Sequence, residues 1–135
     1  MTSSRKDVRI KRSTADRLLD GVKERILLAN ANESFCYRIK RAVVFGSYVN
    51  DPDRDTLGDL DIAVEFEAKY PPNSEEFRDK EMECRSSSWF AAMAWPKEEV
   101  VRYLRNRSGY ISIHDLVTDH EAVFSKDVIE LEVRP

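Results

Sequence analysis

The feature that most constrains this chain is the segment 43–66, which reads VVFGSYVNDPDRDTLGDLDIAVEF. An apolar run ends at Phe45, as expected for a strand that is covered on both faces. Gly46 and Ser47 interrupt the run, and the loop that follows is rich in Asn, Asp and Pro, which are common in tight turns. The segment therefore predicts a strand, a turn, an exposed loop and a return into a second strand.

The second strand is expected at about Asp59–Phe66, where apolar and other side chains alternate with a period of two. One face of this strand should enter the core, and its residues are Leu60, Ile62, Val64 and Phe66. Asp59 and Asp61 have one residue between them and therefore project from the opposite face, at the start of the strand. A pair of carboxylates is thus expected beside the loop, where a ligand has room to bind.

The residue types around this loop suit a divalent metal ion and a polyphosphate. Two like charges at close range are costly unless a cation neutralises them. Mg²⁺ binds one or two protein carboxylates and completes its shell with water and phosphate oxygens, so Asp59 and Asp61 are candidate ligands for Mg²⁺ or Mn²⁺. Gly46 allows the backbone to approach a phosphate closely, and Ser47 offers hydroxyl and N–H donors. A helix that begins near Ser47 would add further N–H donors.

The rest of the chain predicts a small α+β domain. A helix is expected from an N-cap at Ser13 to about residues 30–33, because apolar residues recur at helical spacing at Leu18, Leu19, Val22, Ile26 and Ala29. Further helices are expected from Ser74 to about Ala94 and, after Pro96, to a cap at Gly109. The other expected strands are Tyr37–Phe45, Tyr110–Val117 and Val128–Val133, and Thr118–Glu121 is expected to be a turn.

Three arginines, Arg102, Arg105 and Arg107, lie near the C-terminus of the last of these helices. Cations interact favourably with the helix dipole at this end. That interaction is a sufficient reason for the arginines, and a phosphate-facing role stays open as the alternative.

Length and charge limit the classes of function. With 135 residues and 41% hydrophobic composition, the chain fits one domain over residues 1–135, with residues 1–12 as a flexible basic arm. The net charge of −3 argues against strong general binding to nucleic acid, although a local basic patch is compatible with it. We expect a cytoplasmic protein without a membrane partner, because the sequence shows neither a bilayer-spanning apolar run nor the apolar core of a signal peptide.

The run GSYVNDPDRDTLGDLDIAV resembles the signature of the nucleotidyltransferase superfamily with the DNA polymerase β-like fold. In that signature, a Gly-Ser turn after one strand is followed by Asp-x-Asp at the start of the next. Here eleven residues separate Ser47 from Asp59. The resemblance covers about Tyr37–Val117 and implies a small mixed sheet with helices packed on one face. It also implies transfer of a nucleoside monophosphate from an NTP to a hydroxyl, with Gly46 and Ser47 on the triphosphate and Asp59 and Asp61 on the metals.

Members of this superfamily usually have a third carboxylate on a later strand, which helps to hold the catalytic metal and can take a proton. The expected host is Tyr110–Val117, where Ser112 and His114 face the site if the intervening isoleucines face the core. Ser112 stands where the superfamily has Asp, and Asp115 reaches the site only through a β-bulge. His114 is a candidate catalytic base, because imidazole titrates near neutral pH. Ser112, His114 and Asp115 all stay open for the role of third ligand.

Two functions follow from these expectations. The first is a minimal metal-dependent nucleotidyltransferase that modifies a protein or RNA acceptor supplied separately. Small members of the superfamily include antitoxins that nucleotidylate a partner toxin and toxins that modify tRNA, so a toxin–antitoxin role is one expectation. The second is a catalytically weak or inactive protein of the same fold, which binds nucleotide or a partner protein as a regulator. The serine at position 112 favours the second function, and the Gly-Ser and Asp-x-Asp pairs favour the first.

Overall fold

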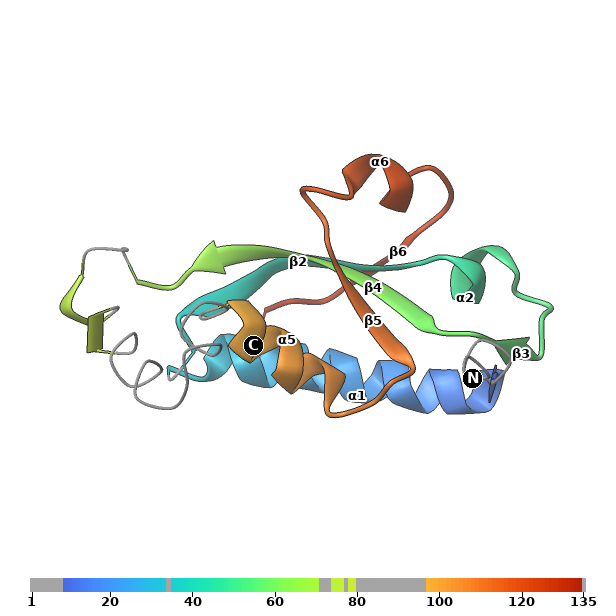
Figure 1. The fold of residues 1–135 in the computed structure, drawn as a ribbon, viewed down its shortest axis with the longest axis horizontal. Coiled ribbons are helices and arrows are strands. Elements are labelled where there is room, and N and C mark those ends of the chain that lie inside the picture. Colours follow the sequence, from blue (N-terminus) through green and yellow to red (C-terminus); the bar gives the residue numbers. More distant parts are fainter. Residues whose placement is uncertain (1–8, 34, 71–73, 77, 80–96, 135) are drawn as a thin grey trace, which may run out of the picture.

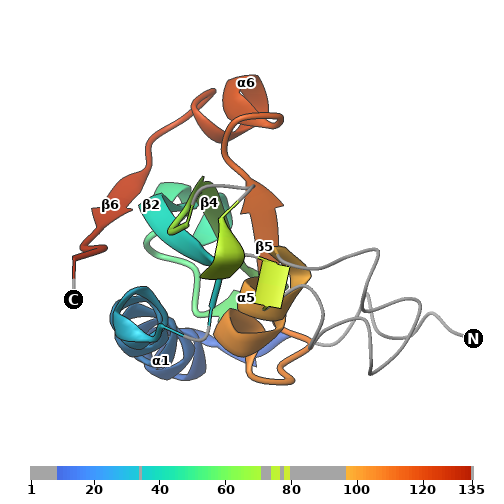
Figure 2. The same cartoon turned by 90° about the vertical axis from the view of Figure 1, so that its left-hand side faces the viewer.

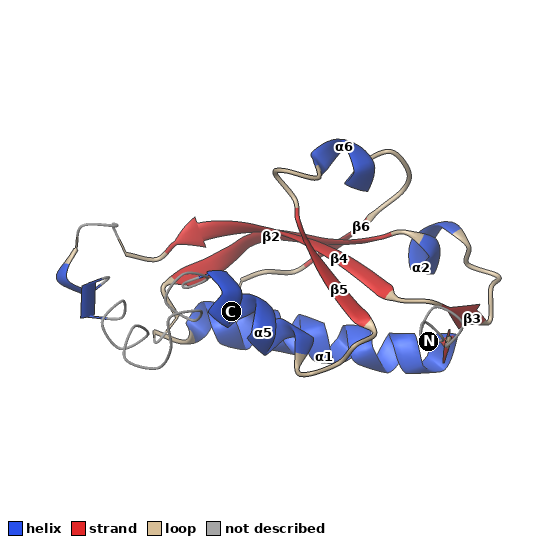
Figure 3. Ribbon diagram, in the orientation of Figure 1, coloured by secondary structure: helices blue, strands red, loops and turns tan. Residues whose placement is uncertain are grey.

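The computed structural model describes residues 9–33, 35–70, 74–76, 78–79 and 97–134. Its centre is a four-stranded sheet with the order β5-β4-β2-β6 (Figures 1 and 3). The strands are β2 (Tyr37–Phe45), β4 (Leu60–Ala68), β5 (Ile111–Asp115) and β6 (Ile129–Leu131). β2 is antiparallel to β4 and to β6, whereas β4 and β5 are parallel. The prediction of a small mixed sheet in an α+β chain is confirmed, and the four strands lie where the sequence predicts them.

Two helices cover one face of this sheet, α1 (Arg12–Ala31) and α5 (Lys97–Arg105). Figure 2 shows both on the same side, with the short helix α6 (His120–Val123) on the other. The turn predicted over Thr118–Glu121 is thus partly helical. The prediction that helices pack on one face holds for α1 and α5 and is wrong for α6.

Helix α1 packs on the sheet through a single apolar stripe, as its spacing predicts. The buried residues of this stripe are Ala15, Leu19, Val22, Ile26 and Ala29. The helix begins at Arg12, and Lys11 takes the N-cap position without a side-chain hydrogen bond. The prediction of Ser13 as N-cap is therefore wrong, and the start of α1 depends on tertiary contacts rather than on a local cap.

The two faces of β4 enter different apolar clusters. Leu60, Ile62 and Val64 belong to the core beneath α1 and α5. Ala63 lies on the opposite face, in a smaller cluster that includes Leu116. Because side chains alternate along a strand, Asp61 shares the face of Ala63, on the side of α6.

A two-stranded sheet holds the start of α1 against the polar loop. β1 (Ile10–Lys11) pairs antiparallel with β3 (Thr56–Leu57). Ile10 and Leu57 are buried in this contact. The basic arm expected over residues 1–12 therefore does not extend to 10–12, because these residues form β1 and begin α1. Residues 1–8 of that prediction lie outside the described residues.

The C-terminus of α5 differs from its prediction. Asn106 and Arg107 have φ angles of 48° and 65° and turn the chain out of the helix, so Gly109 is not the cap. The helix predicted from Ser74 to about Ala94 lies largely outside the described residues, and residues 75–76 and 78–79 of it are helical. Among the described residues, no helix has the length and apolar character needed to cross a membrane.

Candidate functional site

Three strands bring the predicted site residues together on the α6 face of the sheet. In the β2–β4 register, Phe45 lies opposite Asp61, which places the turn after β2 beside the start of β4. In the parallel β4–β5 register, Ser112 lies opposite Asp61 and His114 lies opposite Ala63. The residues that the alternation of β5 predicted to face the site therefore do face it.

Gly46 approaches the carboxylate of Asp61 closely. Its φ of 80° and ψ of −155° fall in a region of backbone conformation that is essentially restricted to glycine. A Cβ atom at this position would also lie 2.7 Å from Oδ2 of Asp61. The site therefore requires glycine here for two independent reasons. As a result, the backbone of Gly46 lies beside Asp61 without a side chain between them.

Asp61 is the more enclosed of the two aspartates, because its side chain is 28% exposed whereas Asp59 is an exposed residue. Burial raises the pKa of Asp61 above its ordinary value. Interaction with His114 opposes this rise in the pKa, and the nearby charge of Asp59 adds to it. An ionised Asp61 therefore has too little positive charge around it, and a bound cation would correct this deficit.

Asp59 is held from the neighbouring strand. The hydroxyl of Ser112 donates to Oδ2 of Asp59 at 3.2 Å. The backbone N–H of Leu60 donates to the carbonyl of Tyr110 at 2.8 Å, which joins the beginnings of β4 and β5. Ser112 thus gives Asp59 a hydroxyl donor and adds no third negative charge to the pair.

His114 lies between two carboxylates. Its Nε2 is 3.4 Å from Oδ1 of Asp61, and its Nδ1 is 3.8 Å from Oδ2 of Asp119, a residue of the turn after β5 that the sequence did not indicate. Nε2 is buried and makes no hydrogen bond within the described part of the chain, so the 3.4 Å contact is electrostatic. The ring also meets the edge of Phe45, with 5.1 Å between centroids. The ring is therefore held between β2, β4 and the turn after β5, with one carboxylate near each nitrogen.

Asp115, the alternative third ligand, does not reach the two aspartates. Its Oδ1 accepts hydrogen bonds from the backbone N–H groups of Val117 at 2.8 Å and Thr118 at 3.1 Å. The β4–β5 register continues through Asp115 without a bulge. Asp115 therefore shapes the turn after β5, and the side chains near the aspartates from this strand are Ser112 and His114.

A helix begins at Ser47, which is the condition under which the sequence offered further N–H donors. This helix is α2 (Ser47–Asn50), which is a single turn. It therefore offers a few N–H donors but has only a small helix dipole. Asn50 fixes this turn in place. Its Nδ2 donates to the carbonyls of Gly46 and Asp127, each at 3.1 Å, and its Oδ1 accepts from the N–H of Asp127 at 3.2 Å. Helix α2 is thereby joined to the segment that leads into β6.

Arg12 holds the polar loop that connects α2 to β3. Its guanidinium donates to the carbonyl of Arg54 at 2.9 Å, of Tyr48 at 3.1 Å and of Asp51 at 2.8 Å. The guanidinium also lies 5.0 Å from the centre of the Tyr48 ring. In the sequence, Arg12 is one of several basic residues near the N-terminus, and nothing local indicates partners some forty positions away.

The described residues offer few ligands to a metal ion. The described residues include no group of three or more His, Cys, Asp or Glu side chains that could hold a metal ion. The carboxylates of Asp59 and Asp61 fit Mg²⁺ or Mn²⁺, because such ions accept few protein ligands and keep positions for water and phosphate oxygens. They do not fit a structural zinc site, which needs four protein ligands rich in nitrogen or sulfur.

No protein family, curated protein or solved structure matches this chain. Its function is therefore inferred from the chemistry of the site. The residues that carry the inference are the turn at Gly46, the carboxylates of Asp59 and Asp61, and the side chains of Ser112 and His114.

Proposed function

We propose that this protein is a nucleotidyltransferase of the polymerase β-like fold that depends on Mg²⁺ or Mn²⁺. It transfers a nucleoside monophosphate from an NTP to a hydroxyl group of a protein or RNA acceptor. The observation that supports this most is the contact at Gly46, where a Cβ would lie 2.7 Å from Oδ2 of Asp61. Bare backbone against a poorly neutralised carboxylate suits a triphosphate and a cation that bind together.

The donor half of the reaction is assigned to β2, α2 and β4. The backbone of Gly46 and the hydroxyl and N–H of Ser47 bind phosphate oxygens. Asp59 and Asp61 would hold the divalent ion, which when bound supplies positive charge to the transferred phosphoryl group and the leaving oxygen. Ser112 keeps Asp59 in position through the 3.2 Å hydrogen bond.

The acceptor half is assigned to His114. The hydroxyl oxygen of the acceptor forms a bond to the α-phosphorus, and the bond from that phosphorus to the pyrophosphate oxygen breaks. Pyrophosphate leaves with the electron pair of the broken bond, and the hydroxyl proton passes to a ring nitrogen of His114. Asp119, at 3.8 Å from Nδ1, orients the ring and stabilises the imidazolium that forms.

One observation favours a second function, that of a nucleotide-binding regulator. The third position is a serine hydroxyl, and no three-carboxylate group occurs among the described residues. A site with two carboxylates can bind a metal and a triphosphate without efficient transfer. In this case the partner of the protein is regulated by nucleotide binding alone.

A labelling experiment separates the two functions. The protein is incubated with each NTP labelled at the α-phosphate, with Mg²⁺ or Mn²⁺ and with host lysate. We expect label on protein or RNA with the wild type and none with Asp59→Asn/Asp61→Asn. The matched control is Asp51→Asn/Asp53→Asn, which removes two exposed carboxylates from the adjacent loop and should keep the activity. Binding of NTP without transfer of label under every condition would contradict the transferase and leave only the regulatory function.

A further inference from the structure

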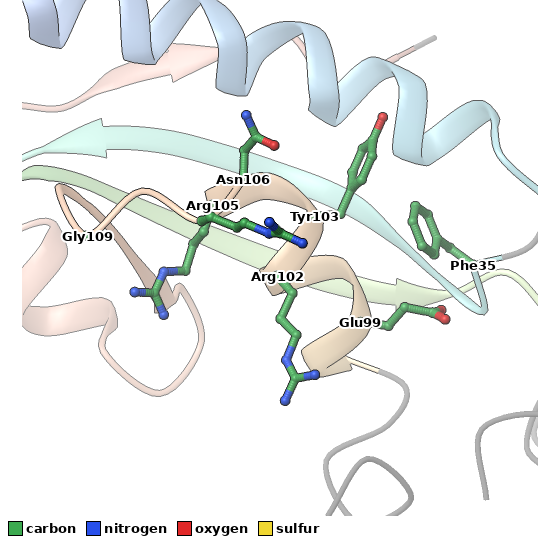
Figure 4. Close-up of a pocket in the computed structure, with 8 residues that line it drawn as sticks. Phe35, Glu99, Arg102, Tyr103, Arg105, Asn106 and Gly109 are labelled. Carbon is green, nitrogen blue, oxygen red and sulfur yellow. The ribbon is translucent and has the colours of Figure 1, made fainter. Parts of the chain in front are cut away.

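A pocket of about 810 Å³ lies beside α5, in a part of the molecule that the proposed reaction does not use (Figure 4). Its lining combines aromatic and basic side chains. These are Phe35 and Tyr103, together with Arg102, Arg105 and Arg107. The carboxylates of Asp59 and Asp61 are absent from the lining, so the pocket is a separate feature.

The aromatic wall of the pocket is preformed. The rings of Phe35 and Tyr103 have centroids 5.3 Å apart and an interplanar angle of 56°. Figure 4 shows these two rings together at one side of the pocket, with Arg105 and Asn106 toward the end of the helix. Tyr103 is partly exposed, so a planar ligand can stack on it, as nucleobases do on tyrosine.

The arginine side chains of the basic wall are available to bind a ligand. All three arginines are exposed. The side chains of Arg105 and Arg107 make no hydrogen bond or ion pair to any residue that the structure describes, and the side chain of Arg102 has only an exposed contact of 3.4 Å to Glu98. Among the described residues of the lining, Glu99 is the one acidic residue. A locally basic pocket in a protein with a net charge of −3 indicates an anionic ligand.

We propose that this pocket binds single-stranded RNA, with a base on Tyr103 and phosphates on Arg105 and Arg107. A nucleic acid strand repeats an aromatic base and a phosphate, and guanidinium groups bind phosphate oxygens in pairs. A protein acceptor offers no comparable repeat. Resting on the proposed function, the inference is that the acceptor of the transfer is this RNA.

The pocket also lies close to the site along the chain. Gly109 lines the pocket, and Ser112, which contacts Asp59, is three residues further on. Because residues 109–110 form a turn, the extended length of roughly 10 Å for three residues is an upper limit on this separation. β5 is an edge strand of the sheet, so an RNA strand held in the pocket can pass around this edge to the aspartates.

Fluorescence anisotropy with a labelled single-stranded RNA of mixed sequence tests the proposal without NTP or metal. We expect Arg105→Gln/Arg107→Gln and, separately, Tyr103→Leu to weaken binding about tenfold each. The matched control is Arg17→Gln/Arg134→Gln, which removes the same charge at two exposed positions outside the pocket. The dependence of log K on log salt should become shallower by about 0.7 for each arginine that contacts a phosphate, and it should not change for Tyr103→Leu.

The outcomes separate this proposal from the proposed function. The proposed RNA site is refuted if the wild type does not bind RNA at low salt. It is also refuted if Arg17→Gln/Arg134→Gln loses as much RNA affinity as the pocket variants. Transfer of label to a protein by a variant that no longer binds RNA overturns the RNA acceptor and leaves the transferase intact. RNA binding through the pocket without any label transfer leaves the RNA site and overturns the transferase. Circular dichroism of each variant verifies that the fold is retained.

Discussion

At the residue scale, Gly46 meets two demands that no other residue type can meet together. Its backbone conformation is one that other residues rarely adopt, and its missing Cβ leaves room for the Asp61 carboxylate. We expect Gly46→Ala to lower the free energy of unfolding by about 1–3 kcal/mol and to abolish transfer by displacing Asp61. Urea denaturation measures the first effect. Gly58→Ala is the control, because a Cβ there meets no atom within 4 Å; equal losses in the two variants would contradict the account.

Asp61 provides a test of the proposed metal site that does not need a substrate. Burial disfavours its charged form, so Asp61→Asn should be more stable than the wild type in the absence of divalent ions at neutral pH. We expect its melting temperature to rise by roughly 2–5 °C. Mg²⁺ should raise the melting temperature of the wild type and leave that of Asp61→Asn unchanged. An equal response of both proteins to Mg²⁺ would place the ion elsewhere.

Tyr48 gives the structure a pH dependence in the alkaline range. Its hydroxyl donates to Asp16, and burial first, then this hydrogen bond, raises the pKa of Tyr48 to about 12. Because the pKa is higher in the folded than in the unfolded chain, the contribution to stability is complete below about pH 10 and is lost as the pH rises toward 12. The difference in unfolding free energy between wild type and Tyr48→Phe should therefore shrink over this range. A difference that stays constant with pH would refute the assignment.

The alternation of side chains along β4 was sufficient to predict that Asp59 and Asp61 share a face. The alternation along β5 was sufficient to predict that Ser112 and His114 face the site. Both predictions depend on alternation alone, which is a local property. Asp119 and Arg12 were not predicted. Asp119 lies in a turn that returns toward His114, and Arg12 binds carbonyls some forty residues away. Neither arrangement produces a local pattern in the sequence.

At the scale of elements, the loop between α2 and β3 depends on Arg12 for its shape. One guanidinium donates to two carbonyls of this loop, those of Asp51 and Arg54, and to the carbonyl of Tyr48 in α2. Lysine keeps the charge but cannot reproduce the planar fork, so Arg12→Lys should cost about 1–2 kcal/mol of stability. Hydrogen exchange of residues 48–55 should accelerate in this variant. Arg17→Lys, an exposed change on the same helix, should affect neither quantity; unchanged exchange in Arg12→Lys would contradict the role of this side chain.

Strands were easier to predict than helix ends in this chain. β2, β4, β5 and β6 follow from apolar runs and alternation, which reflect burial in the sheet. The start of α1 was misplaced because β1 extends the ordered chain upstream, and its pairing with β3 is non-local. The end of α5 was misplaced because Asn106 and Arg107 adopt the left-handed conformation that the sequence rule assigns to glycine.

At the scale of the whole molecule, the sheet separates the main apolar core from the candidate site residues. α1 and α5 cover the face that holds the main core, and the aspartates and His114 lie on the other face with α6. The α+β class and the proximity of β2, β4 and β5 could be predicted from the sequence. Helix α6 and the pocket beside α5 could not, because both depend on how distant segments lie together.

The measurement that tests the central claim most directly follows the phosphates of one NTP through the reaction. Parallel incubations with wild-type protein, Mg²⁺ and acceptor contain the same NTP labelled at the α- or at the γ-phosphate. The account predicts that α-label becomes attached to the acceptor while γ-label is released as pyrophosphate, and that Asp59→Asn/Asp61→Asn does neither. Transfer of γ-label to the acceptor, or release of label with no attachment to any acceptor, would contradict it.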